Sequence, residues 1–167
     1  STGCDEPWRL FPSMCNLSLT GWLAVGATAN ADNPGSNYNG PVSFNDREDI
    51  QLQQLYAVLE RKAESDGGLG VGGRVDLLFG SDYIFTQAAG LETTRNFGNK
   101  WNSRPEYGLA LPQIYGEVAY NDLSIKLGHF YTIIGYEVVT ATGNFFQSHA
   151  YTMQYGEPFT HTGGLGE

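Results

Sequence analysis

The sequence predicts an all-β protein, an antiparallel up-and-down transmembrane β-barrel to which this chain supplies the first five or six strands. Three observations carry the prediction. Charged residues make up 16% of the 167 residues, below the ~25% of soluble domains, while glycines number 22 and aromatic residues are frequent. Several segments alternate between apolar and polar side chains with the period of a β-strand. The connections between these segments are long and short in turn.

The first three strands are recognised by this alternation. One is expected at 17–29, where apolar side chains recur at every second position. The second, at 50–62, alternates less cleanly. The third, at 70–80, is the clearest, because valine, leucine and phenylalanine share one face while Arg74 and Asp76 lie two residues apart on the other. This charged pair is therefore expected to sit together on the polar face.

The next two strands are expected at 112–120 and 123–131. Only Asn121 and Asp122 separate them, and two turn-forming residues between alternating segments predict a tight hairpin. A further strand is expected to begin near Thr162.

The lengths of the connections indicate how the strands are arranged. The links 31–49, 81–111 and 132–161 are long, whereas 63–68 and 121–122 are short. Outer-membrane barrels have short periplasmic turns and long outer loops. We therefore expect residues 1–16 to be a periplasmic N-terminal tail and residues 17–167 to be a partial barrel.

Four charged residues fall on the polar faces of these strands. Arg74, Asp76, Glu117 and Lys126 are predicted to line the lumen, where charged side chains set ion selectivity. The alternative is that they form ion pairs which only stabilise the barrel wall. A soluble β-sandwich would give the same alternation, with the apolar face as its core.

The link 132–161 is unusually aromatic for a loop. An aromatic loop of this kind is not expected to lie fully exposed in water, and it is predicted to fold inward and narrow the lumen. The alternative is packing against a neighbouring subunit or the barrel rim. The candidates for the constriction are Tyr136, Phe145, Phe146, Tyr151 and Phe159.

The net charge and the cysteines bear on possible partners and on a disulfide. The net charge of −9 and the sequence pI near 4.6 argue against a nucleic-acid partner, because binding phosphates needs clustered lysine and arginine. Cys4 and Cys15 are the only cysteines, and two cysteines in an extracytoplasmic protein most often pair. A disulfide is expected, with two free thiols as the alternative.

No metal site, cofactor or enzymatic activity is expected. His129, His149, His161 and Glu157 lack the close spacing of metal ligands. The acidic run Asp46, Glu48 and Asp49 suits Ca²⁺ less well than it suits a solvated surface. The glycine-rich segment 70–73 lies inside a strand and opens no helix, so it is not a nucleotide-binding loop.

Five stretches of the sequence carry a family resemblance. The chain resembles the porin-2 (OmpL-like) family of β-barrel proteins over roughly residues 17–163. Members of that family are much longer, and six strands are too few to close a membrane barrel, so this chain is expected to be one part of a longer barrel or of a barrel built from several chains. The stretches are Gly73–Asp82, Gly135–Val139, Asn144–Phe146, Ser148–Tyr151 and Tyr155–Gly163.

The resemblance implies an outer-membrane pore of a Gram-negative envelope, through which small polar solutes or ions diffuse passively. Its expected partners are outer-membrane lipid and a homo-oligomer or larger envelope assembly. Two other functions remain open: a structural barrel that anchors other envelope proteins, and a secreted β-sandwich that binds a ligand.

Overall fold

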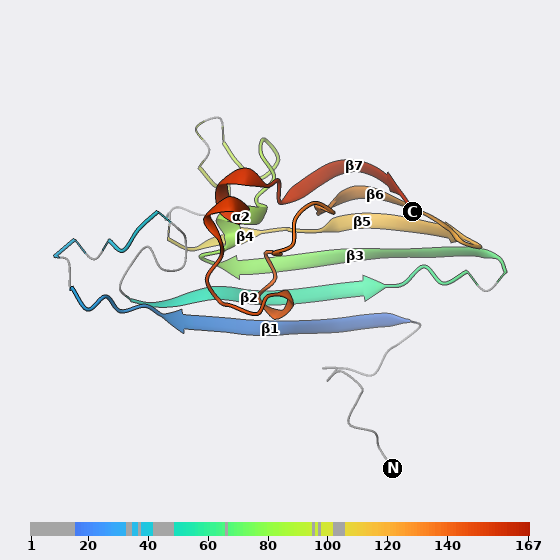
Figure 1. Ribbon diagram of the computed structural model, residues 1–167. Coiled ribbons are helices and arrows are strands. Elements are labelled where there is room, and N and C mark those ends of the chain that lie inside the picture. Colours follow the sequence, from blue (N-terminus) through green and yellow to red (C-terminus); the bar gives the residue numbers. More distant parts are fainter. Residues whose placement is uncertain are drawn as a thin grey trace, which may run out of the picture.

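The strands form one antiparallel sheet. The computed structural model describes residues 16–32, 35–36, 38–41, 49–65, 67–94, 96, 98–101 and 106–167. Strand order is β1-β2-β3-β5-β6-β7, with β4 beside β3, and the sheet is not closed (Figure 1). The strands are β1 (Leu17–Ala27), β2 (Ile50–Arg61), β3 (Leu69–Gly80), β4 (Gly108–Ala110), β5 (Ile114–Tyr120), β6 (Leu123–Tyr131) and β7 (Thr160–Gly166). The all-β prediction is confirmed, and every strand expected from the sequence is present.

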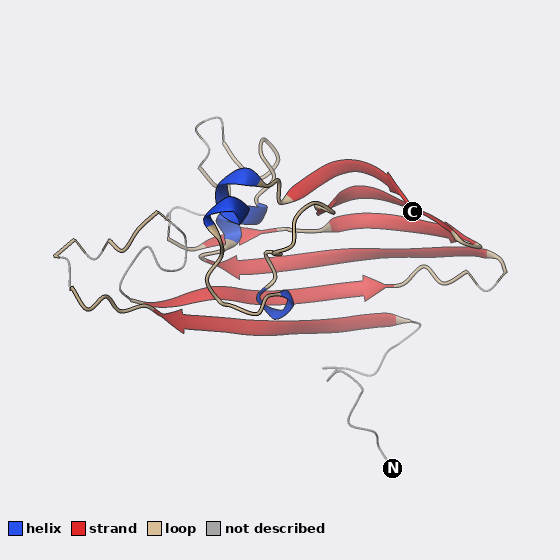
Figure 2. Ribbon diagram, viewed as in Figure 1, coloured by secondary structure: helices blue, strands red, loops and turns tan. Residues whose placement is uncertain are grey.

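Among the described residues, helices occur only in the connections (Figure 2). They are α1 (Tyr83–Thr86), the 3₁₀ turn η1 (Ala141–Gly143) and α2 (Tyr151–Gly156). Within the part of the chain that the structure describes, no helix has the length and apolar character needed to cross a membrane.

The long connections gather at one end of the sheet and the short ones at the other (Figure 1). The β5–β6 turn is the two-residue hairpin that the sequence predicts, because Tyr120 pairs with Leu123. Asn121 has a φ of 51°, a conformation that asparagine tolerates better than most residues. The expected N-terminal tail and Cys4 and Cys15 lie outside the described residues, as do Asp46 and Glu48.

The fourth expected strand, 112–120, is present as β5 but begins at Ile114, and the short strand β4 lies in the link where none was expected. Both β4 and β5 pair with β3, but Leu111, Pro112 and Gln113 separate them. Proline has no N–H to donate to a neighbouring strand, so an interruption at this point is expected. The Gln113 carbonyl nevertheless accepts a hydrogen bond from the Asp76 N–H at 2.8 Å, which keeps the chain beside β3.

A β-bulge explains the imperfect alternation of β2. Ala24 pairs with Gln54 and Val25 pairs with Leu52, so Gln53 is an extra residue in β2. Gln53 and Gln54 are consequently both buried although they are adjacent. The bulge places several glutamine side chains on one face of the strand.

One face of the sheet, here called the apolar face, is exposed and almost free of charge. Of the aspartate, glutamate, lysine and arginine residues within the described strands, only Arg61, at the end of β2, alternates onto this face. Leu69 is 70% exposed and Leu23 is 66% exposed. Other exposed members are Leu17, Val25, Leu55, Leu59, Val71, Leu77, Phe79, Ile114, Val118, Leu123, Ile125 and Leu127.

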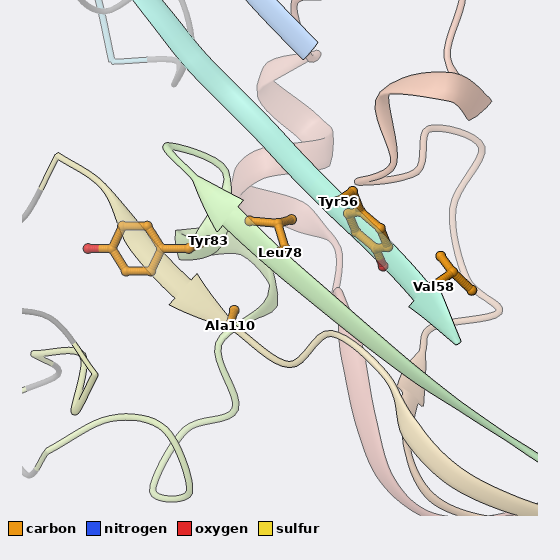
Figure 3. Close-up of a cluster of buried hydrophobic side chains, with 5 residues drawn as sticks. All are labelled: Tyr56, Val58, Leu78, Tyr83 and Ala110. Atoms are coloured by element: carbon orange, nitrogen blue, oxygen red, sulfur yellow. The ribbon is translucent and has the colours of Figure 1, made fainter. Parts of the chain in front are cut away.

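The opposite face, here called the polar face, is the buried one. Leu78 and Ala110 pack there with Tyr56, Val58 and Tyr83 in a cluster contributed by β2, β3, β4 and α1 (Figure 3). Polar residues are buried on the same side, among them Gln51, Gln53, Gln54, Asp76 and Asp82. Burial is therefore inverted relative to a soluble sheet, in which the apolar face forms the core.

Candidate functional site: the polar face and the loop above it

Asp76 is the centre of one polar cluster on β3. Its carboxylate is fully buried and accepts hydrogen bonds from Arg74 Nε at 2.7 Å, from the Tyr56 hydroxyl at 2.6 Å and from Gln113 Nε2 at 2.9 Å. Arg74 Nη1 also lies 3.5 Å from Glu60 Oε1 on β2. A buried carboxylate needs such partners, because an isolated buried charge is strongly unfavourable.

The Tyr56 hydroxyl extends this cluster to β6. It lies 3.1 Å from the Tyr131 hydroxyl, while the Tyr131 N–H donates to Gln113 Oε1 at 3.3 Å. The Tyr56 ring stacks on Trp22 of β1 with centroids 4.1 Å apart. Side chains from β1, β2, β3 and β6 are thus joined across the polar face.

Gln54 is the centre of a second cluster, which joins the sheet to loop 132–159. Its Oε1 accepts from Trp22 Nε1 at 2.8 Å and from the Ala141 N–H at 3.0 Å. Its Nε2 donates to Asp82 Oδ2 at 2.8 Å and to the Val139 carbonyl. Gln54 is fully buried, so these four hydrogen bonds take the place of the bonds that its amide would make to water.

Loop 132–159 lies over the polar face (Figure 1). Its two ends are joined by a hydrogen bond from the Thr132 N–H to the Phe159 carbonyl at 2.9 Å. Val139 and Met153 of the loop pack with Phe85 of α1 in a second buried cluster. Backbone hydrogen bonds to Gln54 and this apolar packing hold the loop against the sheet.

The predicted lumen residues form two pairs, one on β3 and one across β5 and β6. Arg74 and Asp76 are in contact, as the two-residue spacing predicts. Glu117 and Lys126 are paired in register on β5 and β6, and both are partly buried. Lys126 Nζ lies 3.2 Å from Glu167 Oε2. That these residues line a pore remains a prediction.

The candidate constriction residues divide into two groups. Phe159 faces the sheet side of the loop, where its ring contacts Phe85 with centroids 5.2 Å apart. Tyr136 is 98% exposed and Phe145 is 94% exposed, and Phe146 and Tyr151 are also exposed. Phe145 and Phe146 lie beside Leu23, Ala24 and Val25 of β1. A narrowing role for these four residues stays a prediction.

Sequence reasoning missed the residues that hold the loop. The sequence alone predicts no role for the residues that make these contacts, which are Gln54, Trp22, Tyr56, Gln113 and Tyr131. The one available signal was the run of glutamines at 51, 53 and 54, which is unusual in a strand.

The histidines do not converge. Among the residues that the structure describes, no group of three histidine, cysteine, aspartate or glutamate side chains is placed to hold a metal ion. His149 Nδ1 lies 3.8 Å from Glu137 Oε2. Burial lowers the pKa of His149, and the nearby Glu137 opposes that change.

Burial of the Asp82 carboxyl group is expected to make the stability of the protein depend on pH. Burial raises the pKa of Asp82 to about 6, and the hydrogen bonds from Gln54 and Ser81 oppose the rise. The folded state therefore binds more protons than the unfolded state between about pH 4 and 6, so the free energy of unfolding falls as pH rises through this window. We expect a loss on the order of 2 kcal/mol.

Asp82→Asn is expected to remove this part of the pH dependence. Thermal unfolding in detergent at pH 4.5 and pH 7.5 measures it, with the parent chain as the reference. An identical change in midpoint for the parent and for Asp82→Asn would show that Asp82 does not contribute.

An exposed apolar face, a buried polar face and a loop folded over the latter define the wall of a membrane β-barrel rather than a soluble sandwich. The comparison with protein families agrees with this class. Residues 16–166 match the model of the family described as "Putative beta-barrel porin-2, OmpL-like", and the chain belongs to that family. The comparison with curated proteins and the comparison with solved structures gave no match.

Proposed function

We propose that the chain forms part of the wall of a bacterial outer-membrane pore, through which small polar solutes or ions diffuse passively. The inverted burial of the two faces supports this proposal most strongly. Leucine and valine side chains on the apolar face are suited to lipid, whereas the partly exposed charges of Arg74, Glu117 and Lys126 on the polar face are suited to a hydrated lumen. Asp76 is fully buried on that face and contributes as the partner of Arg74.

The pore needs more strands than this sheet provides. A sheet in lipid has to be closed, because each unpaired N–H or C=O in the hydrocarbon region costs several kcal/mol. Strands β1 and β7 form the two edges of the described sheet. We propose that further strands, from the same polypeptide or from other copies, pair with both edges.

Within this pore, loop 132–159 narrows the passage. Its position over the polar face supports that role, and Gln54 anchors it. Two of the Gln54 hydrogen bonds go to the loop backbone, at Val139 and Ala141. Each contributes about 1 kcal/mol net, so losing both shifts the docking equilibrium by roughly 30-fold.

Gln54→Leu is expected to raise the single-channel conductance, because the loop leaves the polar face more often. The measurement is ion current through the protein reconstituted in planar bilayers. Gln51→Leu is the matched control: Gln51 is buried on the same face of the same strand, and among the described residues its amide nitrogen has no hydrogen-bond partner. The control is expected to conduct like the parent.

The proposed pore would be contradicted if the parent chain, reconstituted together with the strands that close the barrel, conducted no ions. Equal conductance of the parent and Gln54→Leu would contradict only the role of the loop.

A second candidate is an anchoring barrel that docks other envelope proteins. The exposed aromatic rings of Tyr136, Phe145 and Phe146 favour it, because large exposed apolar patches mark interaction sites. Conductance distinguishes the two, since an anchoring barrel is not required to pass ions.

A further inference from the structure

Loop 132–159 forms a partly open cavity of about 170 Å³. The end of β6 and the first residues of the loop form one wall, and Met153 of α2 and residues 157–159 form the other. Its apolar lining includes Ile133, Ile134, Val138, Val139, Met153 and Phe159. An apolar cavity of about 150 Å³ is large enough to bind benzene. The cavity therefore accommodates an apolar body about the size of a benzyl group.

The charged groups of the lining are both carboxylates. They belong to Glu137 and Glu157, and no lysine or arginine is among the lining residues. Glu137 Oε2 accepts a hydrogen bond from the Ala150 N–H at 2.9 Å, which fixes its position. Within the described part of the chain, the Glu157 carboxylate has neither an ion pair nor a hydrogen bond.

Gly135 makes room for the Glu157 carboxylate. A Cβ atom on residue 135 would overlap Glu157 Oε2, and the φ of Gly135 is 104°, a conformation that favours glycine. The Glu157 carboxylate therefore lies directly beside the backbone of residue 135 and next to the apolar lining. Glu157 is partly exposed, so its carboxylate is accessible to the cationic group of a ligand.

We propose that this cavity binds a small amphiphilic organic cation, a protonated amine carrying an apolar body about the size of a benzyl group. The ammonium group would lie at Glu157 and Glu137, and the apolar body would lie against Val139, Met153 and Phe159. As a statement about the solutes that enter the pore, this rests on the proposed function. Binding itself requires only that the loop be folded.

Met153 gives a direct readout of occupancy. The sequence contains two methionines, Met14 and Met153, so ¹³C-methyl labelling of methionine gives two signals. The full chain in detergent micelles is titrated with benzylamine, benzyl alcohol and benzoate at neutral pH. Benzylammonium is expected to move the Met153 signal saturably without a comparable change at Met14. Benzyl alcohol is expected to bind about fivefold more weakly, the effect of one partly exposed charge pair, and benzoate more weakly still.

Glu157→Gln is expected to weaken benzylammonium binding about fivefold and to leave benzyl alcohol binding unchanged. Asp122→Asn is the control, because it removes the same charge from an exposed turn at the other end of the sheet. The proposal is overturned if benzoate binds as tightly as benzylammonium, or if the Met153 signal does not respond saturably. The comparison of the three ligands in the parent chain tests the proposed cation site even if Glu157→Gln fails to fold.

The titration is independent of ion conduction. A saturable response at Met153 in a chain that does not conduct would contradict the pore and support the cavity. Conduction without a response at Met153 would support the pore and overturn the cavity.

Discussion

Replacing Asp76 with alanine is expected to lower the free energy of unfolding by about 3–5 kcal/mol. The Asp76 carboxylate is the shared acceptor for Arg74, Tyr56 and Gln113. Its removal leaves the Arg74 guanidinium partly buried without its main partner, and it leaves a buried hydroxyl and a buried amide to be satisfied elsewhere. The loss exceeds that of an ordinary surface substitution because these groups cannot return to bulk water.

Unfolding of the protein in lipid vesicles by denaturant measures this effect. Asp32→Ala provides the control, because Asp32 is an exposed acid in a connection and its loss is expected to change stability by no more than about 0.5 kcal/mol. If Asp76→Ala were as stable as this control, the Asp76 cluster would not be a major source of stability.

Replacing Val75 with lysine is expected to cost about 2–4 kcal/mol in lipid, the range for a cation at the middle of the bilayer on the outer face of a barrel. Val75 lies near the middle of β3 and pairs with Leu59 and Ile114, which are both exposed on the apolar face. A lysine in this row would have to extend far along the sheet to reach water.

Thr20→Lys is the comparison for this substitution. Thr20 is partly buried and alternates with Trp22 onto the polar face of β1. In a hydrated lumen the same lysine is expected to cost less there than at Val75. The two variants are compared by refolding yield into vesicles and by denaturant midpoint. A larger cost at Thr20 than at Val75 would reverse the assignment of the two faces.

The strands were predictable because their cause is local. In β3 the alternation of Val75, Leu77 and Phe79 with Arg74 and Asp76 specifies both the strand and its faces without reference to any other segment. The β5–β6 hairpin was predictable for the same reason, since two turn residues between alternating segments determine the pairing. The short strand β4 was missed, because three residues before Pro112 carry no measurable alternation.

The loop attachment was not predictable because its cause is distant. Gln54 contacts Val139 and Ala141, which lie more than 80 residues further along the chain. A single sequence shows an aromatic loop and a run of glutamines, but it does not show that a glutamine side chain bonds to the backbone of that loop. The aromatic residues drew attention to loop 132–159, whereas the contacts with the sheet are made mainly by backbone groups and by Val139, Met153 and Phe159.

The assignment of the apolar face to lipid is tested most directly by nitroxide labels along β3. Cys4 and Cys15 are replaced with serine, and single cysteines at 71, 72, 75, 77, 78 and 79 are labelled in protein reconstituted in vesicles. Labels at 71, 75, 77 and 79 are expected to collide with dissolved oxygen, which concentrates in lipid, and to be protected from a water-soluble nickel complex. Labels at 72 and 78 are expected to be protected from oxygen. Ready collision of the nickel complex with 71, 75, 77 and 79 would contradict the membrane barrel.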